Sequence, residues 1–200
     1  TGVSVFFKKH LISADSVRMG GDHVTRDISM GLQIPNAAAE RIKTLYGGTM
    51  ATGMDDREMI ETDGNSGDWE HDRRQVSRSE LIGIIRPRME EVLEDVRDRL
   101  DVAGFDSLPG KQIVLTGGAS QIPGLDGLAA RILGQHVRLG RPIRLQGLPQ
   151  AATGPAFSGV VGLALNAANP QDEWWDFQVP QSQLIGRPVR RAARWFRDNW

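Results

Sequence analysis

The sequence predicts an α/β fold, because segments with the pattern of strands alternate along the chain with segments that have the pattern of helices. Three observations support this prediction. Residues 3–7 (VSVFF) are rich in β-branched and aromatic residues, as strands are. Residues 79–100 repeat apolar side chains at helical spacing. Residues 112–115 (QIVL) lead through a glycine turn into another helical pattern, which gives the order strand, turn, helix.

The composition is that of a globular chain without an electrostatic preference for nucleic acid. Its 200 residues carry a formal net charge of -1, and 40% of them are hydrophobic, which is enough for a core. The absence of cysteine excludes disulfides and thiolate chemistry, and the four histidines lack metal-ligand spacing. No apolar run approaches the roughly 20 residues of a membrane-spanning helix. Because Thr1 stands inside a strand pattern without an initiator Met, we expect a fragment of a longer protein.

The first half of the chain is expected to form a hairpin followed by two helices. A second extended run, residues 11–19, follows residues 3–7 and favours an antiparallel hairpin. After Gly20 and Gly21, residues 22–32 carry apolar side chains at helical spacing. Pro35 predicts the start of a second helix that ends at Gly47-Gly48. Residues 62–74 are expected to form an exposed loop that joins short strands.

The second half of the chain is expected to begin with one long helix. Ser77 and Glu80 are three residues apart, as in a capping box, and predict a helix over about residues 79–100 that Pro87 kinks. A strand at 112–115, the TGG turn at 116–118 and a helix over 125–133 follow. Residues 136–142 and 143–147 are predicted as short edge strands or extended connections, and residues 154–168 as a last helix of small residues.

The two glycine turns are the candidate ligand-binding features. Glycine at a turn lets the main chain approach a ligand closely, and a helix that follows can help to bind an anion. Residues 111–134 have neither the G-x-G-x-x-G of a dinucleotide fold nor the G-x-x-x-x-G-K-[ST] of a P-loop. A tight turn without a ligand explains the TGG segment equally well. Similarly, Glu40 and Lys43 are helix neighbours that fit a solvated ion pair or a pair that reaches a nucleotide.

Five segments, in this order, resemble the second domain of the actin-like ATPases, and most closely that of the FtsA family of bacterial cell-division proteins. They are VSVF (3–6), VRMGGDHVTRDI (17–28), AERIKTLYG (39–47), SELIGIIRPRMEEVLEDV (79–96) and IVLTGGASQIPGL (113–125). The resemblance implies that residues 1–169 form an actin-like, ribonuclease H-like domain that is half of a nucleotide cleft. It also implies that the longer protein binds ATP with magnesium and has weak ATPase activity or none.

The resemblance assigns binding roles to ten residues. The adenosine wall is formed by Gly117, Gly118, Ala119, Gln121 and Ile122. Facing this wall from a helix are Glu40, Lys43 and Thr44, and near the phosphates lie Gly20 and Gly21. The family's magnesium-organising acids lie mostly in its first domain and in a D-x-G-x-x-T turn whose last letters would be Thr1 and Gly2. We therefore expect no metal ligands in this chain and no catalysis from this chain alone.

The last 31 residues are predicted to be a linker and a terminal helix. Residues 170–186 contain prolines, glutamines and acids without periodicity, as flexible linkers do. Within them, Trp174, Trp175 and Phe177 either pack on the domain or form a docking motif for a partner.

Residues 187–200 (RPVRRAARWFRDNW) predict a basic amphipathic helix. At about 100° per residue, one arc of roughly 100° contains Val189, Ala192, Ala193, Phe196 and Trp200. The opposite side contains Arg187, Arg190, Arg191, Arg194 and Arg197, with Trp195 at a flank. Such a helix fits the interface of an anionic membrane. A surface helix packed on the domain and an arginine-rich tail that binds RNA or protein remain alternatives, but the FtsA family ends in a linker and a membrane-targeting helix.

The resemblance therefore implies a peripheral membrane protein of cell division. Such a protein binds ATP, self-associates into protofilaments and anchors the tubulin-like protein FtsZ, with other divisome proteins, to the cytoplasmic face of the inner membrane at the division site. Two alternatives stay open: an actin-superfamily enzyme or chaperone, such as a sugar kinase or an Hsp70-like ATPase, and a pilus-assembly relative. The basic terminal helix argues against both, because neither needs it.

Overall fold

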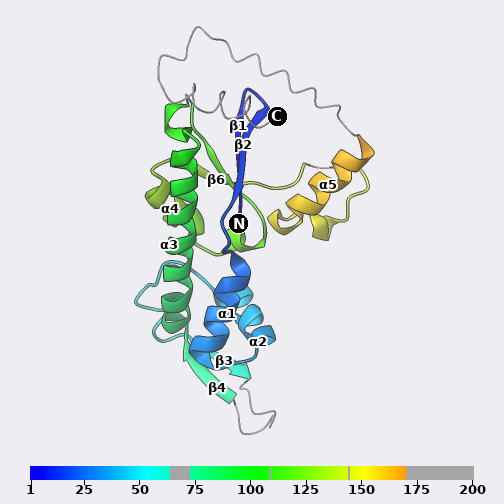
Figure 1. Cartoon of the computed structure of the whole chain (residues 1–200). Helices are drawn as coiled ribbons and strands as arrows, with labels where there is room; N and C mark the ends of the chain where they lie inside the picture. The colour runs from blue at the N-terminus through cyan, green and yellow to red at the C-terminus, as the bar shows by residue number, and fades with distance from the viewer. Residues whose placement is uncertain (64–72, 109, 144, 170–200) are drawn as a thin grey trace. The chain divides into compact units, whose positions relative to one another are not determined.

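The computed structural model describes residues 1–63, 73–108, 110–143 and 145–169 (Figure 1). It begins with an antiparallel hairpin of β1 (Gly2–Phe7) and β2 (His10–Ser16), as predicted. The hairpin turns at Lys8 and Lys9, which both have positive φ. After β2 the chain returns to its start, because Val17 N–H donates to Thr1 O at 2.8 Å and Thr1 Oγ1 donates to Met19 O at 2.7 Å. These bonds hold the segment that leads into the first helix.

Two helices follow the hairpin, and both were predicted. Helix α1 (Gly21–Leu32) and helix α2 (Asn36–Tyr46) pack against each other. The buried stripe of α1 consists of Val24, Thr25, Ile28 and Leu32. Pro35 precedes the first residue of α2, where its missing amide costs nothing, and Gly47 N–H closes the helix by donating to Lys43 O at 3.1 Å.

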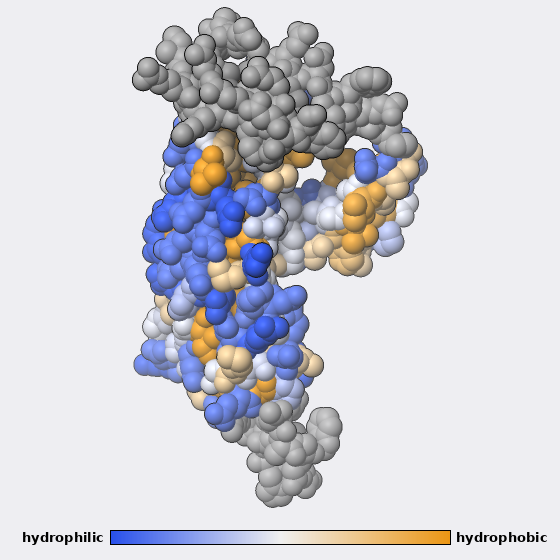
Figure 2. All heavy atoms as spheres, in the orientation of Figure 1, coloured by the Kyte–Doolittle hydropathy of each residue, from blue (hydrophilic) through white to orange (hydrophobic). Residues whose placement is uncertain are grey.

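A second hairpin leads into the longest helix. Strand β3 (Met59–Asp63) pairs antiparallel with β4 (Arg73–Ser77), so the strands extend into both ends of the predicted loop. Helix α3 (Arg78–Val102) begins where Glu80 N–H donates to Ser77 Oγ at 3.2 Å, and it continues through Pro87. Its buried face packs on α1 and on α4. Its outward face is hydrophilic, as Figure 2 shows.

The last described part is a strand–helix–strand unit followed by a helix. Strand β5 (Ile113–Leu115) pairs in parallel with β6 (Val137–Leu139), and α4 (Leu125–Leu133) lies between them in the sequence. The described residues of 143–147 form a connection and a turn, not a strand; Pro142, just before them, has no amide to donate to a ladder. The last helix, α5 (Ser158–Ala168), was predicted and begins a few residues later.

The core joins the apolar faces of α1, α2, α3 and α4 with residues of the two hairpins. Helix α5 differs from the other helices, because its buried set contains only Val161 while Val160 and Leu163 are 66% and 72% exposed. Figure 2 shows hydrophobic residues on the surface of α5. Among the helices described here, none is long and apolar enough to cross a membrane. The predicted linker (170–186) and the predicted basic helix (187–200) lie outside the described residues.

The core position of Ile85 on α3 gives a stability prediction. Ile85 is fully buried, so Ile85→Ala is expected to lower the free energy of unfolding by about 2–5 kcal/mol through lost burial and a residual cavity. Urea denaturation followed by circular dichroism measures the change. Val102→Ala on the same helix is the control, because Val102 is 88% exposed and its truncation should change stability by less than about 0.5 kcal/mol. Equal effects of the two substitutions would contradict the packing described here.

Candidate functional site

The ammonium group of Lys43 joins α2 to the start of α1. Its Nζ donates to Gly21 O at 3.2 Å, to Thr25 Oγ1 at 2.7 Å and to Glu40 Oε2 at 2.6 Å. A lysine ammonium has three hydrogens, so these acceptors use all of them. The side chain is only 9% exposed. Lys43 therefore links α2 to α1 from a buried position. Helix spacing alone suggests instead a solvated ion pair with Glu40.

Glu40 is half exposed and is held through one of its two carboxylate oxygens. Its side chain is 54% exposed, and Oε2 accepts hydrogen bonds from Lys43 and from Thr25. Burial raises the pKa of Glu40, but these two hydrogen bonds and the charge of Lys43 lower it, and the net pKa falls below its ordinary value of 4.5. Glu40 is consequently ionised at neutral pH. Among the described residues, Oε1 has no hydrogen-bond partner.

The turn at Gly20-Gly21 and the TGG turn lie near the ammonium group of Lys43. A Cβ added at Gly21 would lie 3.2 Å from Ala119 Cβ and 3.8 Å from Lys43 Nζ, so a side chain at residue 21 would crowd the segment that follows the TGG turn. Gly117 has a φ of 91°, which favours glycine, and its N–H donates to Pro155 O at 3.0 Å. The turn then forms the short 3-10 helix η2 (Gly118–Gln121).

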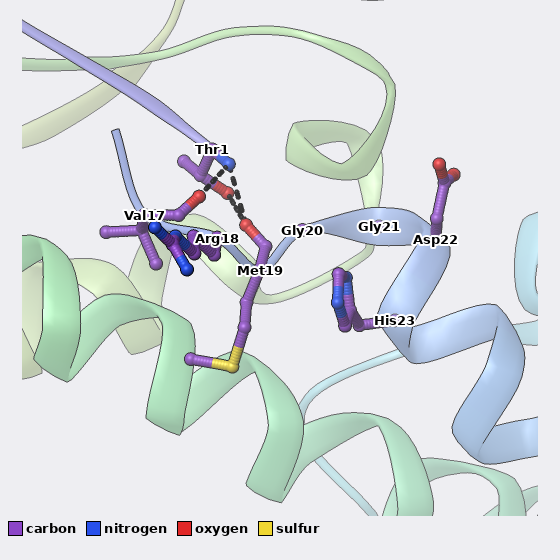
Figure 3. Close-up of a pocket in the computed structure, with 8 residues that line it drawn as sticks. All are labelled: Thr1, Val17, Arg18, Met19, Gly20, Gly21, Asp22 and His23. Carbon is purple, nitrogen blue, oxygen red and sulfur yellow. Dashed lines mark hydrogen bonds between the residues drawn. The ribbon is translucent and has the colours of Figure 1, made fainter. Parts of the chain in front are cut away.

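An open hollow of about 330 Å³ lies beside Gly20 and Gly21 (Figure 3). Its lining consists of Thr1, Val17, Arg18, Met19, Gly20, Gly21, Asp22 and His23. Figure 3 shows Thr1 bonded to Val17 and Met19, and Asp22 and His23 on the first turn of α1. The start of a helix attracts anions, and Arg18 adds a positive charge, whereas Asp22 opposes them. The lining of the hollow therefore combines two features that favour an anionic group with one carboxylate that disfavours it.

The structure brings together some of the predicted binding residues and leaves others apart. Gly21, Glu40, Lys43 and Ala119 converge, and Gly20 lines the hollow. Thr44 is exposed, and its hydroxyl donates to Glu40 O at 2.8 Å within α2. Ile122 is 7% exposed and belongs to the core, while Gln121 is exposed. No three His, Asp or Glu side chains of the described residues gather closely enough to hold a metal ion.

Thr25 is a site residue that neither the motifs nor the resemblance single out. This residue shares the buried stripe of α1 with Ile28 and Leu32, three and seven positions further on. A hydroxyl on a buried face needs a hydrogen-bond partner, and this requirement was the signal that could have found it. Its hydroxyl lies within hydrogen-bond distance of Lys43 and Glu40, the two charged residues of the site, and of Gly21 O.

Comparison with known proteins decides the family. The family model for "Cell division protein FtsA" matches residues 1–162. The chain belongs to the FtsA family. It is 46% identical to the cell division protein FtsA of Agrobacterium fabrum, over all of this chain and 46% of that protein. The chain therefore spans about half the length of the curated relatives it matches. The predicted family is confirmed, which favours cell division over the alternatives of a sugar kinase, a chaperone or a pilus-assembly protein.

Solved structures confirm the actin-like fold of this FtsA-family chain. MreB 5 of Spiroplasma citri, in a crystal structure bound to AMPPNP, matches with a TM-score of 0.59 over 84% of this chain and 49% of that one, at 14% identity. The PilM-PilN type IV pilus biogenesis complex matches with a TM-score of 0.58 over 84% of this chain and 43% of that one, at 19% identity. At these identities the likeness shows a shared fold.

The lowered pKa of Glu40 gives a prediction for the pH dependence of stability. Above its unfolded pKa of about 4.5, the ionised carboxylate stabilises the fold, and this contribution is lost as the pH falls through the lowered folded pKa. Glu40→Gln is therefore expected to lower Tm at about pH 7, with a difference that shrinks as the pH falls below 4.5 and through the lowered folded pKa. Because Glu40 is half exposed, the effect should stay below about 1 kcal/mol.

Thermal unfolding of both proteins across this pH range measures the effect. Glu94→Gln, a change of an exposed glutamate on α3, is the control and should leave Tm close to that of the unaltered chain. A Tm difference for Glu40→Gln that is constant from neutral pH into acid would contradict the role assigned to the carboxylate.

Proposed function

We propose that this chain forms one wall of the ATP-binding cleft of an FtsA protein, and that the protein anchors FtsZ to the membrane. The observation that carries the nucleotide part is the convergence of Gly21, Lys43 and Ala119, with the open Oε1 of Glu40 beside them. Two main-chain turns in close contact, next to a fixed carboxylate, suit a ligand that has an anionic end and a hydroxylated middle. Membership of the FtsA family supports the same proposal.

In the proposed complex the TGG turn lies against the adenosine. Gly117, Gly118 and Ala119 present main chain, which a base can approach closely. Glu40 meets the ribose, and Gly20 and Gly21 lie on the side of the phosphates, next to the hollow. The described residues contain no acidic cluster for magnesium, so the ion's ligands would come from the rest of the protein. On this proposal the chain binds and orients nucleotide but does not hydrolyse it by itself.

The proposed tether uses residues 187–200. Their arginines would lie at the anionic cytoplasmic face of the inner membrane, and their aromatic side chains would enter the interface. FtsZ binding, self-association into protofilaments and contacts with other divisome proteins at the division site complete the proposal. They are supported by the family match and by the basic amphipathic pattern.

Alanine substitutions test the nucleotide wall. In a protein of its relatives' length that contains this chain, Glu40→Ala and Lys43→Ala should each weaken ATP binding roughly tenfold, because each removes a hydrogen-bonded charge from the site. Isothermal titration measures the affinity, and Glu94→Ala serves as the control. Unchanged affinity in both variants would show that Glu40 and Lys43 form a purely structural ion pair.

Vesicle co-sedimentation tests the tether. The 200-residue chain should bind anionic liposomes, lose binding at high salt, and fail to bind neutral liposomes, because its attraction to the surface is largely electrostatic. Phe196→Glu with Trp200→Glu should abolish binding by placing charge on the apolar stripe.

The matched control carries Gln181→Glu with Gln183→Glu, which makes the same change in net charge within the predicted linker. This control should keep most of the binding. Binding lost equally in both double variants, or absent under all conditions, would show that the terminal segment does not anchor the chain to lipid.

A further inference from the structure

Thr25 stands between the two charged residues of the site. Its Oγ1 accepts a hydrogen bond from Lys43 Nζ at 2.7 Å, and it lies 2.5 Å from Glu40 Oε2 and 3.2 Å from Gly21 O. A hydroxyl has a single hydrogen to donate. Because the carboxylate is both nearer and charged, the hydrogen is directed to Glu40. Lys43, Thr25 and Glu40 thus form a closed triangle of hydrogen bonds.

This triangle fixes the orientation of the Glu40 carboxylate. Lys43 and Thr25 both bond to Oε2, so the group is held through one oxygen by two donors on different helices. Without the hydroxyl, only Lys43 would hold Oε2, through a long side chain on the same helix as Glu40. Thr25 is 8% exposed and lies in the first half of α1. Because Thr25 adds no charge, what it contributes is the orientation of the Glu40 carboxylate.

The oxygen left over, Oε1, can only accept hydrogen bonds, because the carboxylate is ionised. A nucleotide offers donors on its ribose hydroxyls and on its base. Oε2 of the same carboxylate is linked through Lys43 to Gly21 O, and a side chain at residue 21 would meet Ala119, which directly follows the TGG turn. Glu40 is therefore placed between the proposed phosphate side and the proposed adenosine side. The ribose is the part of a nucleotide that joins these two ends.

We propose that Thr25 is a positioning residue that aims the free oxygen of Glu40 at a ribose hydroxyl, and that it thereby sets a preference for ribonucleotides over deoxyribonucleotides. This inference rests on the proposed nucleotide function. A site that bonds a substrate hydroxyl binds the analogue that lacks it less tightly, because a hydrogen bond to the charged carboxylate is lost. The preference depends on the direction of the carboxylate, and the direction depends on Thr25.

The test uses a protein of its relatives' length that contains this chain. It compares the affinities for ATP, 2′-deoxy-ATP and 3′-deoxy-ATP by competition against a fluorescent ATP analogue. The unaltered protein should bind ATP roughly tenfold more tightly than at least one deoxy analogue. Thr25→Val keeps the shape of the side chain but removes the hydroxyl, and it should reduce this ratio to about twofold or less. Thr25→Ser keeps the hydroxyl and should retain the ratio.

A merely structural role for Thr25 would weaken all three ligands together and leave the ratio unchanged, which would overturn the inference. Equal binding of the three nucleotides by the unaltered protein would overturn it too, while the ATP site would stand. If the unaltered protein bound no nucleotide at all, both the proposed function and this inference would be wrong. Should Thr25→Val not fold, Glu40→Ala tests the same ratio at an exposed residue, and a retained ratio there rejects the proposal.

Discussion

The arrangement of the site depends on one buried ammonium group. A buried charge is costly unless it is paired and hydrogen-bonded, and Lys43 meets this condition with three acceptors: the main chain of Gly21, the hydroxyl of Thr25 and the carboxylate of Glu40. Two of these acceptors belong to α1 and one to α2. The requirement to satisfy Lys43 therefore sets the distance between the helices at this end.

The TGG turn is held from both of its ends. On one side, Gly117 N–H donates to Pro155 O, and Thr116 Oγ1 donates to Ser158 Oγ at 2.6 Å, at the start of α5. On the other side, Ile122 is buried in the core and the next residue, Pro123, accepts a hydrogen bond from Thr49 N–H at 3.0 Å. The turn is consequently ordered by protein contacts before a ligand arrives. Such ordering reduces the entropy lost on binding.

The sequence was informative where structure follows from local spacing. The hairpin, the helices and the cap at Ser77 were predicted, because period, glycine and capping residues act over a few positions. It was uninformative where structure depends on contacts between distant segments. Helix spacing shows that Glu40 and Lys43 are neighbours, but the burial of Lys43 comes from α1, some 20 positions earlier. The role of Thr25 could not be predicted for the same reason, because its charged partners lie on another helix.

A single wall of this kind can orient a nucleotide better than it can retain one. Ligand sites bury most of their ligand's surface, whereas the hollow here is open and comes from one short segment with Thr1. The chain spans about half the length of its relatives, and on the proposed function most of the affinity would come from residues outside the matched half. On the same proposal, this wall orients the nucleotide. It does so with two main-chain turns and with the Glu40 carboxylate, whose Oε2 is already hydrogen-bonded. A nucleotide that closes the cleft would find these groups already in place, so its binding energy would be available for drawing the two walls together.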